Sequence, residues 1–312
     1  MVSQSADAGI DRRIDVEIPA GKDRMAGWLY SSRKYTASNP GPAIVLAHGL
    51  GATKELKLDV YASKFNELGY TALVFDYRCN GGSTGLPHGL IDWNMQQEDW
   101  HTALAWLRAN AENVDPERIG LFGTSFGGGH VIQVGAADPR VKAVISQCPF
   151  TNGWKSALCC GLAQLPRMYW LGILDVLFGT DENPVRIHVV GKPGEIALMN
   201  APDVTDGFYP LLPLDKHEYY FKNMTVPARL IASFPLLAPG AHAAKIKVPV
   251  LFAICGKDTV APPKTTLAYA KKAPKGVIRY FDDMGHFDIY LGEKHDRAWK
   301  EYRQFILEAL PV

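Results

Sequence analysis

The stretch Ile-Gly-Leu-Phe-Gly-Thr-Ser-Phe-Gly-Gly-Gly-His-Val, residues 119–131, constrains the fold of this chain more than any other. An apolar run ends at Gly123, and Ser125 follows two residues later. Three glycines, Gly127 to Gly129, then begin a segment of helical character. In a sharp strand-to-helix turn, the helix approaches the strand so closely that the residues two before and two after the central one must be very small. Gly123 and Gly127 occupy those two positions. The pattern therefore predicts a turn that lifts the Ser125 hydroxyl clear of the sheet.

Two interpretations of this turn are open. In the first, the Gly-x-Ser-x-Gly pattern is a nucleophile elbow, and the N-terminus of the following helix favours negative charge that develops beside Ser125. In the second, it is an ordinary tight turn in which the serine caps the helix. The first interpretation requires a base, a carboxylate and oxyanion donors elsewhere in the chain.

Short apolar runs alternate with segments of helical period on both sides of the turn. Such alternation with short connections is typical of a mostly parallel sheet with helices on both faces. The expected strands cover 13–20, 24–32, 42–49, 71–77, the run before Ser125, 141–148, 248–256 and 276–283, and the expected helices cover 56–70, 94–111, 125–137, 262–273 and 296–310. The chain is thus predicted to be an α/β protein with a large central sheet.

The alternation stops at residues 150–245, which are rich in Pro, Leu and aromatic residues. We interpret this segment as a mostly helical lid insertion, and residues 1–149 and 246–312 as the core. Aromatic and leucine side chains of a lid are suited to an apolar substrate pocket. The pocket candidates are Trp170, Leu174, Phe178 and Tyr219. The alternative is that these side chains pack the lid onto the body of the protein.

Charge and hydropathy exclude several classes of partner. The 312 residues carry a formal net charge of +1, and no run of about five like charges occurs, so no nucleic-acid partner is expected. No stretch approaches about 18 uninterrupted apolar residues, and the first residues contain no apolar signal segment. These features favour a cytoplasmic protein without a membrane span. A homodimer is compatible with the sequence.

The five cysteines show no Cys-x-x-Cys spacing. Cys148 and Cys255 fall in or just after apolar runs, where a buried free thiol is the commonest occupant. We therefore expect reduced structural thiols. No metal or organic cofactor is expected, because no HExxH, Walker or dinucleotide-binding pattern occurs in a suitable setting.

A serine hydroxyl is a poor nucleophile until a base removes its proton, and a histidine usually does so. His286 is the strongest of nine candidates, because it follows Gly285 in a loop just past the last expected strand. His130 stands five residues after the serine on the same expected helix, and we interpret it as a packing residue.

The histidine in turn needs a carboxylate, which fixes its tautomer and stabilises its protonated form. Asp258 stands two residues past Gly256, at the end of an expected strand. The rivals by proximity to the histidine are Asp282, Asp283 and Asp288. We rank them lower, because a carboxylate only a few residues from a histidine seldom lies opposite the imidazole ring of that histidine.

A tetrahedral intermediate needs hydrogen-bond donors already in place for its oxyanion. The backbone N–H of Phe126 is one candidate, since it directly follows the serine. Leu50 is the candidate for the second, because it lies in the turn His-Gly-Leu-Gly that follows an expected strand. The neighbouring Gly49 and Gly51 remain alternatives.

These pieces together resemble the α/β-hydrolase-fold serine hydrolases. The motifs HGLG, FDYRCNGGSTG, GTSFG, CGKDTVAP and MGHFD occur in the order of that family and lie within residues 42–310. The second motif resembles the corresponding stretch in the branch that includes dienelactone hydrolases and X-Pro-type acyl peptidases. This resemblance implies that Tyr77 and Arg78 shape the turn beside the oxyanion loop. The segment PFTNGWKSAL is similar to that of hydrolases and polyketide transferases of fungal polyketide pathways.

The resemblance implies an α/β-hydrolase fold and a serine hydrolase that cleaves an ester, thioester or lactone. Ser125, His286 and Asp258 would form the triad, and the pocket would favour a small-molecule substrate with an apolar acyl group. One alternative is an acyltransferase that passes the acyl group to an acceptor other than water. The other is a non-catalytic binding module on the same fold.

Overall fold

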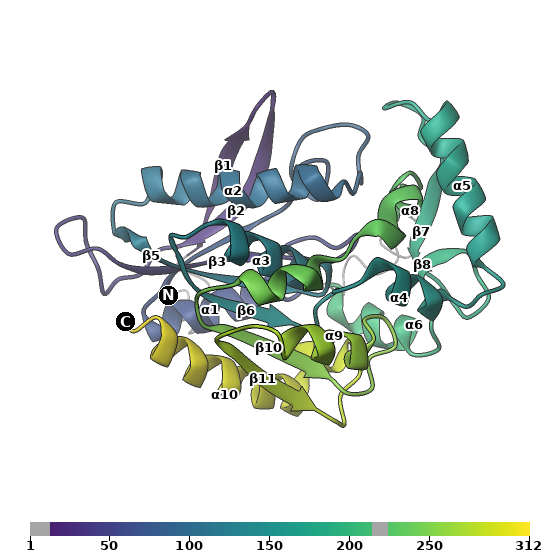
Figure 1. Ribbon diagram of the computed structural model, residues 1–312. Helices are drawn as coiled ribbons and strands as arrows, with labels where there is room; N and C mark the ends of the chain where they lie inside the picture. The colour runs from purple at the N-terminus through teal and green to yellow at the C-terminus, as the bar shows by residue number, and fades with distance from the viewer. Residues whose placement is uncertain (1–12, 214–223) are drawn as a thin grey trace, which may run out of the picture.

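The computed structural model describes residues 13–213 and 224–312, and a large sheet forms its centre (Figure 1). The strand order is β1-β2-β4-β3-β5-β6-β10-β11. The β1–β2 and β2–β4 pairs are antiparallel, and the other pairs are parallel. The strands are β1 (Arg13–Ala20), β2 (Asp23–Tyr30), β3 (Gly41–Ala47), β4 (Thr71–Phe75), β5 (Val114–Thr124), β6 (Val141–Gln147), β10 (Val250–Cys255) and β11 (Gly276–Phe281).

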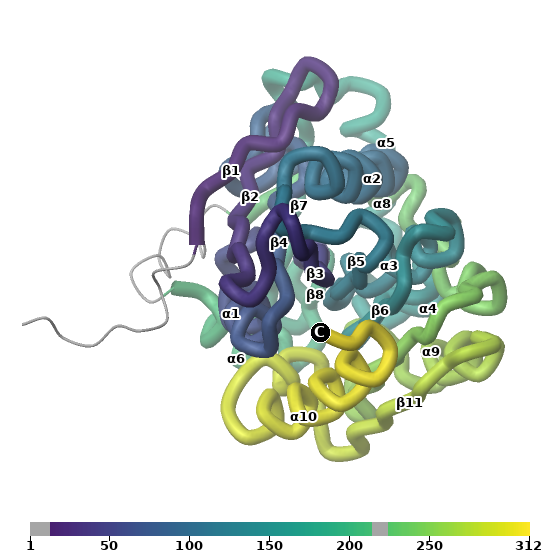
Figure 2. Tube along the Cα trace, turned by 90° about the vertical axis from the view of Figure 1, so that its left-hand side faces the viewer, coloured from purple at the N-terminus to yellow at the C-terminus, as the bar shows by residue number. Residues whose placement is uncertain are grey.

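Helices cover both faces of the sheet (Figure 2). On β3, Ile44 and Leu46 pack in the core that contains α1 (Leu58–Leu68) and α10 (Gly292–Ala309). The alternate residues of β3 pack in the core of the opposite face, with α2 (Trp93–Asn110), α3 (Phe126–Ala137) and α9 (Pro263–Ala270). The predicted α/β architecture is confirmed, and the predicted strands and helices are found within a few residues of their expected ends.

The predicted insertion lies at the end of the sheet opposite the C-terminus (Figure 1). It contains helices, as expected, and a three-stranded sheet of order β8-β7-β9 that the sequence did not reveal. These strands were missed because they are only three to five residues long. Among the described residues, the α-helices and strands of the insertion are α4 (Gly153–Ala157), α5 (Leu165–Phe178), α6 (Val204–Phe208), α8 (Leu230–Ser233), β7 (Arg186–Val190), β8 (Ala197–Met199) and β9 (Thr225–Pro227). The 3₁₀ helices are η1 (Leu158–Cys160), η2 (Tyr209–Leu211), η4 (Phe234–Leu236) and η5 (Pro239–Lys245), with η6 (Asp288–Tyr290) in the core.

Within the described residues, no helix is both long and apolar enough to cross a membrane.

His130 is a packing residue of α3, as the sequence suggested. Its ring stacks on Trp93, with the ring centroids 3.9 Å apart, and its Nε2 lies 2.9 Å from the side-chain oxygen of Gln96. The side chain is fully buried. Burial lowers the pKa of His130 well below its usual value, because a charged imidazole would lose its hydration.

We predict that His130 makes the folded protein sensitive to acid. The unfolded chain binds a proton at this residue below about pH 6.5 and the folded chain does not, so its contribution to stability is complete above that pH and is lost as the pH falls. In His130→Gln, the melting temperature should decline less steeply than in the wild type between about pH 6.5 and pH 5. The exposed His101 offers a matched control in His101→Gln, which should keep the wild-type slope. A wild-type slope in the His130 variant would contradict the prediction.

Candidate active site

Ser125 lies in the strained turn that the glycine pattern predicts. It joins β5 to α3 with φ 57° and ψ −116°, a conformation that side-chain-bearing residues rarely adopt. A Cβ atom on Gly123 would collide with the carbonyl oxygen of Gly127, and a Cβ atom on Gly127 would collide with that of His48. The two glycines are therefore required by the close approach of strand and helix.

The structure brings Ser125, His286 and Asp258 together in a chain of hydrogen bonds. His286 Nε2 lies 3.0 Å from Ser125 Oγ, and His286 Nδ1 lies 2.7 Å from Asp258 Oδ2. The other carboxylate oxygen accepts from the backbone N–H groups of Val260 and Ala261, at 2.9 and 2.6 Å. All three side chains of the chain are buried. With its carboxylate held in this way, His286 presents Nε2 to the serine hydroxyl.

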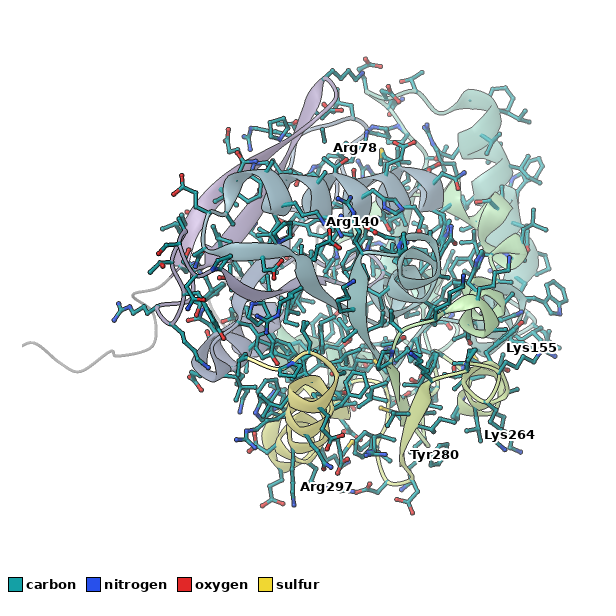
Figure 3. All side chains as sticks on the ribbon, turned by 60° about the vertical axis from the view of Figure 1, so that its left-hand side comes forward. Arg78, Arg140, Lys155, Lys264, Tyr280 and Arg297 are labelled. Carbon is teal, nitrogen blue, oxygen red and sulfur yellow. The ribbon has the colours of Figure 1, made fainter. Side chains whose placement is uncertain are left out.

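Two of the three rival carboxylates, Asp283 and Asp288, have other partners, and the third, Asp282, is exposed. Asp283 is bonded to Arg297 of α10 at 2.6 Å, on the outside of the molecule (Figure 3). Asp288 accepts from the backbone N–H of Gly285 and from Lys294, both at 2.7 Å. Asp258 is therefore the carboxylate positioned to orient the imidazole.

Leu50 and Phe126 both line the cavity at Ser125. Neither backbone N–H has an acceptor among the residues that the structure describes. A Cβ atom on Gly49 would lie 2.8 Å from Ser125 Cβ, so the loop after β3 runs directly beside the serine. Unpaired amides at the N-terminus of α3 and in this loop are suited to an oxyanion.

A buried carboxylate that the sequence analysis missed holds this loop. Asp76 follows β4 and is fully buried. It accepts from the backbone N–H and the Nζ of Lys54, at 2.7 and 2.6 Å, and from the backbone N–H of Gly82 at 3.0 Å. Asp76 thus ties the loop that contains Leu50 to the end of the neighbouring strand. A charged residue directly after an apolar strand was the available signal.

Tyr77 supports the same region, as the family resemblance implies, whereas Arg78 does not contact the loop after β3. The Tyr77 hydroxyl donates to the carbonyl oxygen of His48 at 3.5 Å and accepts from Trp100 at 3.0 Å. Arg78 turns instead to α2, where it binds Asp99 (Figure 3). Burial lowers the pKa of His48, which favours its neutral form beside the loop.

The cysteines near the site are free thiols, and Cys148 and Cys255 are buried as expected. Burial raises the pKa of Cys148 and of Cys160 to about 12, so both stay protonated at neutral pH. Neither thiol is therefore suited to act as a nucleophile, because the thiolate is the reactive form. Over residues 13–213 and 224–312, no cluster of three or more His, Cys, Asp or Glu is placed to hold a metal ion.

Two cavities meet at Ser125. The first has about 480 Å³ of empty space and is mostly apolar. The second has about 400 Å³ and also contains His286. A further cavity of about 350 Å³ adjoins the first, with which it shares Leu50, Cys160, Leu198 and Phe234, and it is lined by Leu165, Met168 and Tyr169 of α5. The other apolar residues of the first cavity are Phe126, Phe150, Met199, Ala201, Val260 and Ala261.

Three of the four pocket residues expected from the insertion lie elsewhere. Trp170 and Phe178 are 60% and 72% exposed on α5, and Leu174 of the same helix is partly buried. None of the three lines a cavity at Ser125. Tyr219 lies outside the described residues. Helix α5 carries apolar residues on both its buried and its exposed sides, so its sequence could not distinguish the side that faces the cavity from the side that faces solvent.

A family model described as "Alpha/beta hydrolase family" matches residues 44–300. The chain belongs to the α/β-hydrolase family. It is 38% identical over 300 residues to the quorum-quenching protein AidA of Acinetobacter baumannii, covering 96% of each chain. It is 28% identical to the thiohydrolase aneE of Aspergillus aculeatus, covering 91% of each. Among solved structures it is similar to the α/β hydrolase GrgF from Penicillium sp., with a TM-score of 0.77, 22% identity, and coverage of 96% of this chain and 99% of that one.

We predict that a fluorophosphonate probe labels the protein at Ser125. The probe reacts with a serine whose proton is taken by a base, so labelling should be lost in Ser125→Ala. Ser156 lines the same cavity without a hydrogen-bond partner in the described structure, and Ser156→Ala is the matched control that should label like the wild type. Labelling that persists in the Ser125 variant would show that the nucleophile is another residue.

Proposed function

We propose that the protein is a serine hydrolase that cleaves an ester, thioester or lactone of an apolar acyl group. The observation that carries this proposal is the chain of hydrogen bonds from Ser125 through His286 to Asp258. Ser125 Oγ attacks the carbonyl carbon while His286 Nε2 takes its proton, and the carbonyl electron pair moves to the oxygen. Asp258 stabilises the imidazolium that forms.

The remaining steps complete the acylation of Ser125 and then reverse it with water, and they use the same groups. The tetrahedral intermediate collapses to an acyl-serine, and His286 gives its proton to the leaving oxygen or sulfur. A water molecule then attacks the acyl-serine and gives a proton to the same nitrogen, and His286 returns that proton to Ser125 Oγ as the carboxylic acid leaves. The amides of Leu50 and Phe126 stabilise the oxyanion in both halves.

The linings of the two cavities support a placement for each end of the substrate. The leaving group must lie within reach of His286, which lines the second cavity and not the first. The acyl chain then occupies the first cavity, beside Phe150 and Phe234, and continues into the adjoining cavity. The names of the relatives, a quorum-quenching protein and a thiohydrolase, are consistent with activated acyl compounds as substrates.

Acyl transfer is the second candidate function. The observation that favours it is the apolar wall of the second cavity, where Met199, Phe208, Leu211 and Phe287 surround the approach to His286. An acceptor with an apolar body fits this wall better than water does. When an alcohol is added, a transferase would release the ester of that alcohol, whereas a hydrolase would release the carboxylic acid. Analysis of the products distinguishes transfer from hydrolysis.

We predict that Asp258→Asn lowers kcat by roughly 10³–10⁴-fold while the fold persists. The asparagine oxygen can still accept from Val260 and Ala261, but its NH₂ group would face His286 Nδ1 and favour the tautomer whose Nε2 carries the proton. That nitrogen could not accept from Ser125. The matched control Asp283→Asn, on the exposed pair with Arg297, should keep wild-type kcat. Equal activity of both variants would move the carboxylate role away from Asp258.

We predict that kcat/KM for p-nitrophenyl esters rises with acyl length from acetate until the first cavity and the adjoining one are filled. Each buried methylene contributes about 0.8 kcal/mol, which limits the rise to about fourfold per methylene. Ala157 lines only the adjoining cavity, so Ala157→Phe should shorten the preferred chain and leave acetate hydrolysis near the wild-type rate. Leu211→Phe, in the second cavity, should leave the chain-length preference unchanged. A preference unaffected by Ala157→Phe would place the acyl chain elsewhere.

A further inference from the structure

Helix α5 presents a large apolar surface to solvent. Trp170, Ile173, Val176, Leu177 and Phe178, which we call the α5 outer face, are 60%, 42%, 57%, 65% and 72% exposed. The helix lies at the outer end of the insertion, away from the central sheet (Figure 1). Contiguous exposed apolar residues of this size are unusual on a soluble monomer and mark sites of interaction.

The inner side of the helix is firmly attached, so the outer face is presented in a defined orientation. Asp175 is buried and accepts from the backbone N–H and the Nε of Arg229, at 2.9 and 2.8 Å, and from the backbone N–H of Val185 at 2.7 Å. A Cβ atom on Gly172 would lie 3.1 Å from Ile231 Cβ, so α5 and α8 are in close contact. A rotation of the helix that buried the outer face would break the hydrogen bonds that the Asp175 carboxylate accepts from Arg229 and Val185.

The spacing of the exposed residues favours a helix as the partner. Pro166, Trp170, Ile173 and Leu177 are all exposed and follow one another at intervals of four, three and four residues. This spacing forms the seam along which two helices interlock. A lipid surface fits less well, because helices that lie on membranes carry Lys and Arg on their polar side. Between Leu165 and Phe178 the charged residues are Arg167 and the buried Asp175.

The charges at the two ends of α5 favour a second copy of the same helix in the antiparallel direction. Arg167 lies exposed in the first turn, and Asp181 and Glu182 are exposed just beyond the last. An antiparallel partner brings the first turn of one copy beside the last turn of the other, so each arginine approaches the acidic pair of its partner. The contact of Asp181 with Arg229 is long, at 4.0 Å, and leaves it available. A two-fold axis repeats the contact, as expected for a closed dimer.

We propose that the protein forms a homodimer through the α5 outer face, with the two α5 helices antiparallel about a two-fold axis. This pairing does not involve the inner side of the helix, which lines a cavity. Leu165, Met168 and Tyr169 line this cavity, which adjoins the first cavity at Ser125. The dimer contact thus lies directly behind one wall of the proposed acyl site. The proposal itself depends on the surface of α5 and not on the reaction.

The test is sedimentation velocity on the full chain over about a hundredfold range of concentration, since dimerisation follows mass action. The wild type should sediment as a dimer. Trp170→Glu and Ile173→Glu should each raise the dimer dissociation constant by at least about 30-fold, as loss of a central apolar contact does. Tyr280→Glu is the matched control, because Tyr280 is 47% exposed on β11, far from α5 (Figure 3), and it should remain dimeric.

Charge reversal at exposed positions tests the antiparallel arrangement without disturbing the apolar residues. Arg167→Glu should weaken the dimer, and combining it with Asp181→Lys and Glu182→Lys should restore it. A wild type that is monomeric at every concentration would overturn the proposal. So would dimers unaffected by the glutamate variants, or a monomer that binds phosphatidylcholine–phosphatidylglycerol vesicles through the α5 outer face. Far-ultraviolet circular dichroism establishes that each variant is folded before it is scored.

Discussion

The close approach of three backbone segments is the constraint on which the site depends. Gly123 and Gly127 allow α3 to lie against β5, and Gly127 also contacts the carbonyl oxygen of His48 at the end of β3. Gly49 then passes beside Ser125. Because no side chain separates these segments, the amides after β3 and at the start of α3 reach the same point in space as the serine oxygen. The strained φ of Ser125 is the cost of that arrangement.

The parallel sheet explains how residues so distant in sequence meet. Strands β5, β6, β10 and β11 are parallel neighbours, so their carboxyl ends lie at one edge. Ser125, Asp258 and His286 each follow the end of one of these strands. Once the order of strands and loops was read from the sequence, the convergence of the three residues followed from topology. This is why both the fold and the three polar residues could be predicted without coordinates.

The parts that could not be predicted depend on which side of an element faces the protein. Trp170 and Met168 stand two residues apart in an apolar helix, yet the first is exposed and the second lines a cavity. Periodicity distinguishes the two sides only when one of them is polar. Asp76 was missed for a different reason, since its role arises from contacts with Lys54, 22 residues away, that no local pattern contains. The short strands of the insertion were missed for a similar reason, since they are stabilised by pairing with one another and not by a local sequence pattern.

The insertion supplies much of the wall of the cavities at Ser125. In the proposed reaction the triad and the loop that Asp76 holds supply the reactivity, whereas the first cavity and the adjoining one take most of their walls from residues 150–245. Asp203 of this segment accepts from Thr259 at 2.6 Å, directly after Asp258, so the insertion is also anchored to the loop that carries the carboxylate. In the proposed dimer, α5 excludes water on both sides: substrate contacts its inner side and the partner helix its outer side. Two apolar surfaces on opposite sides account for a helix without an amphipathic pattern.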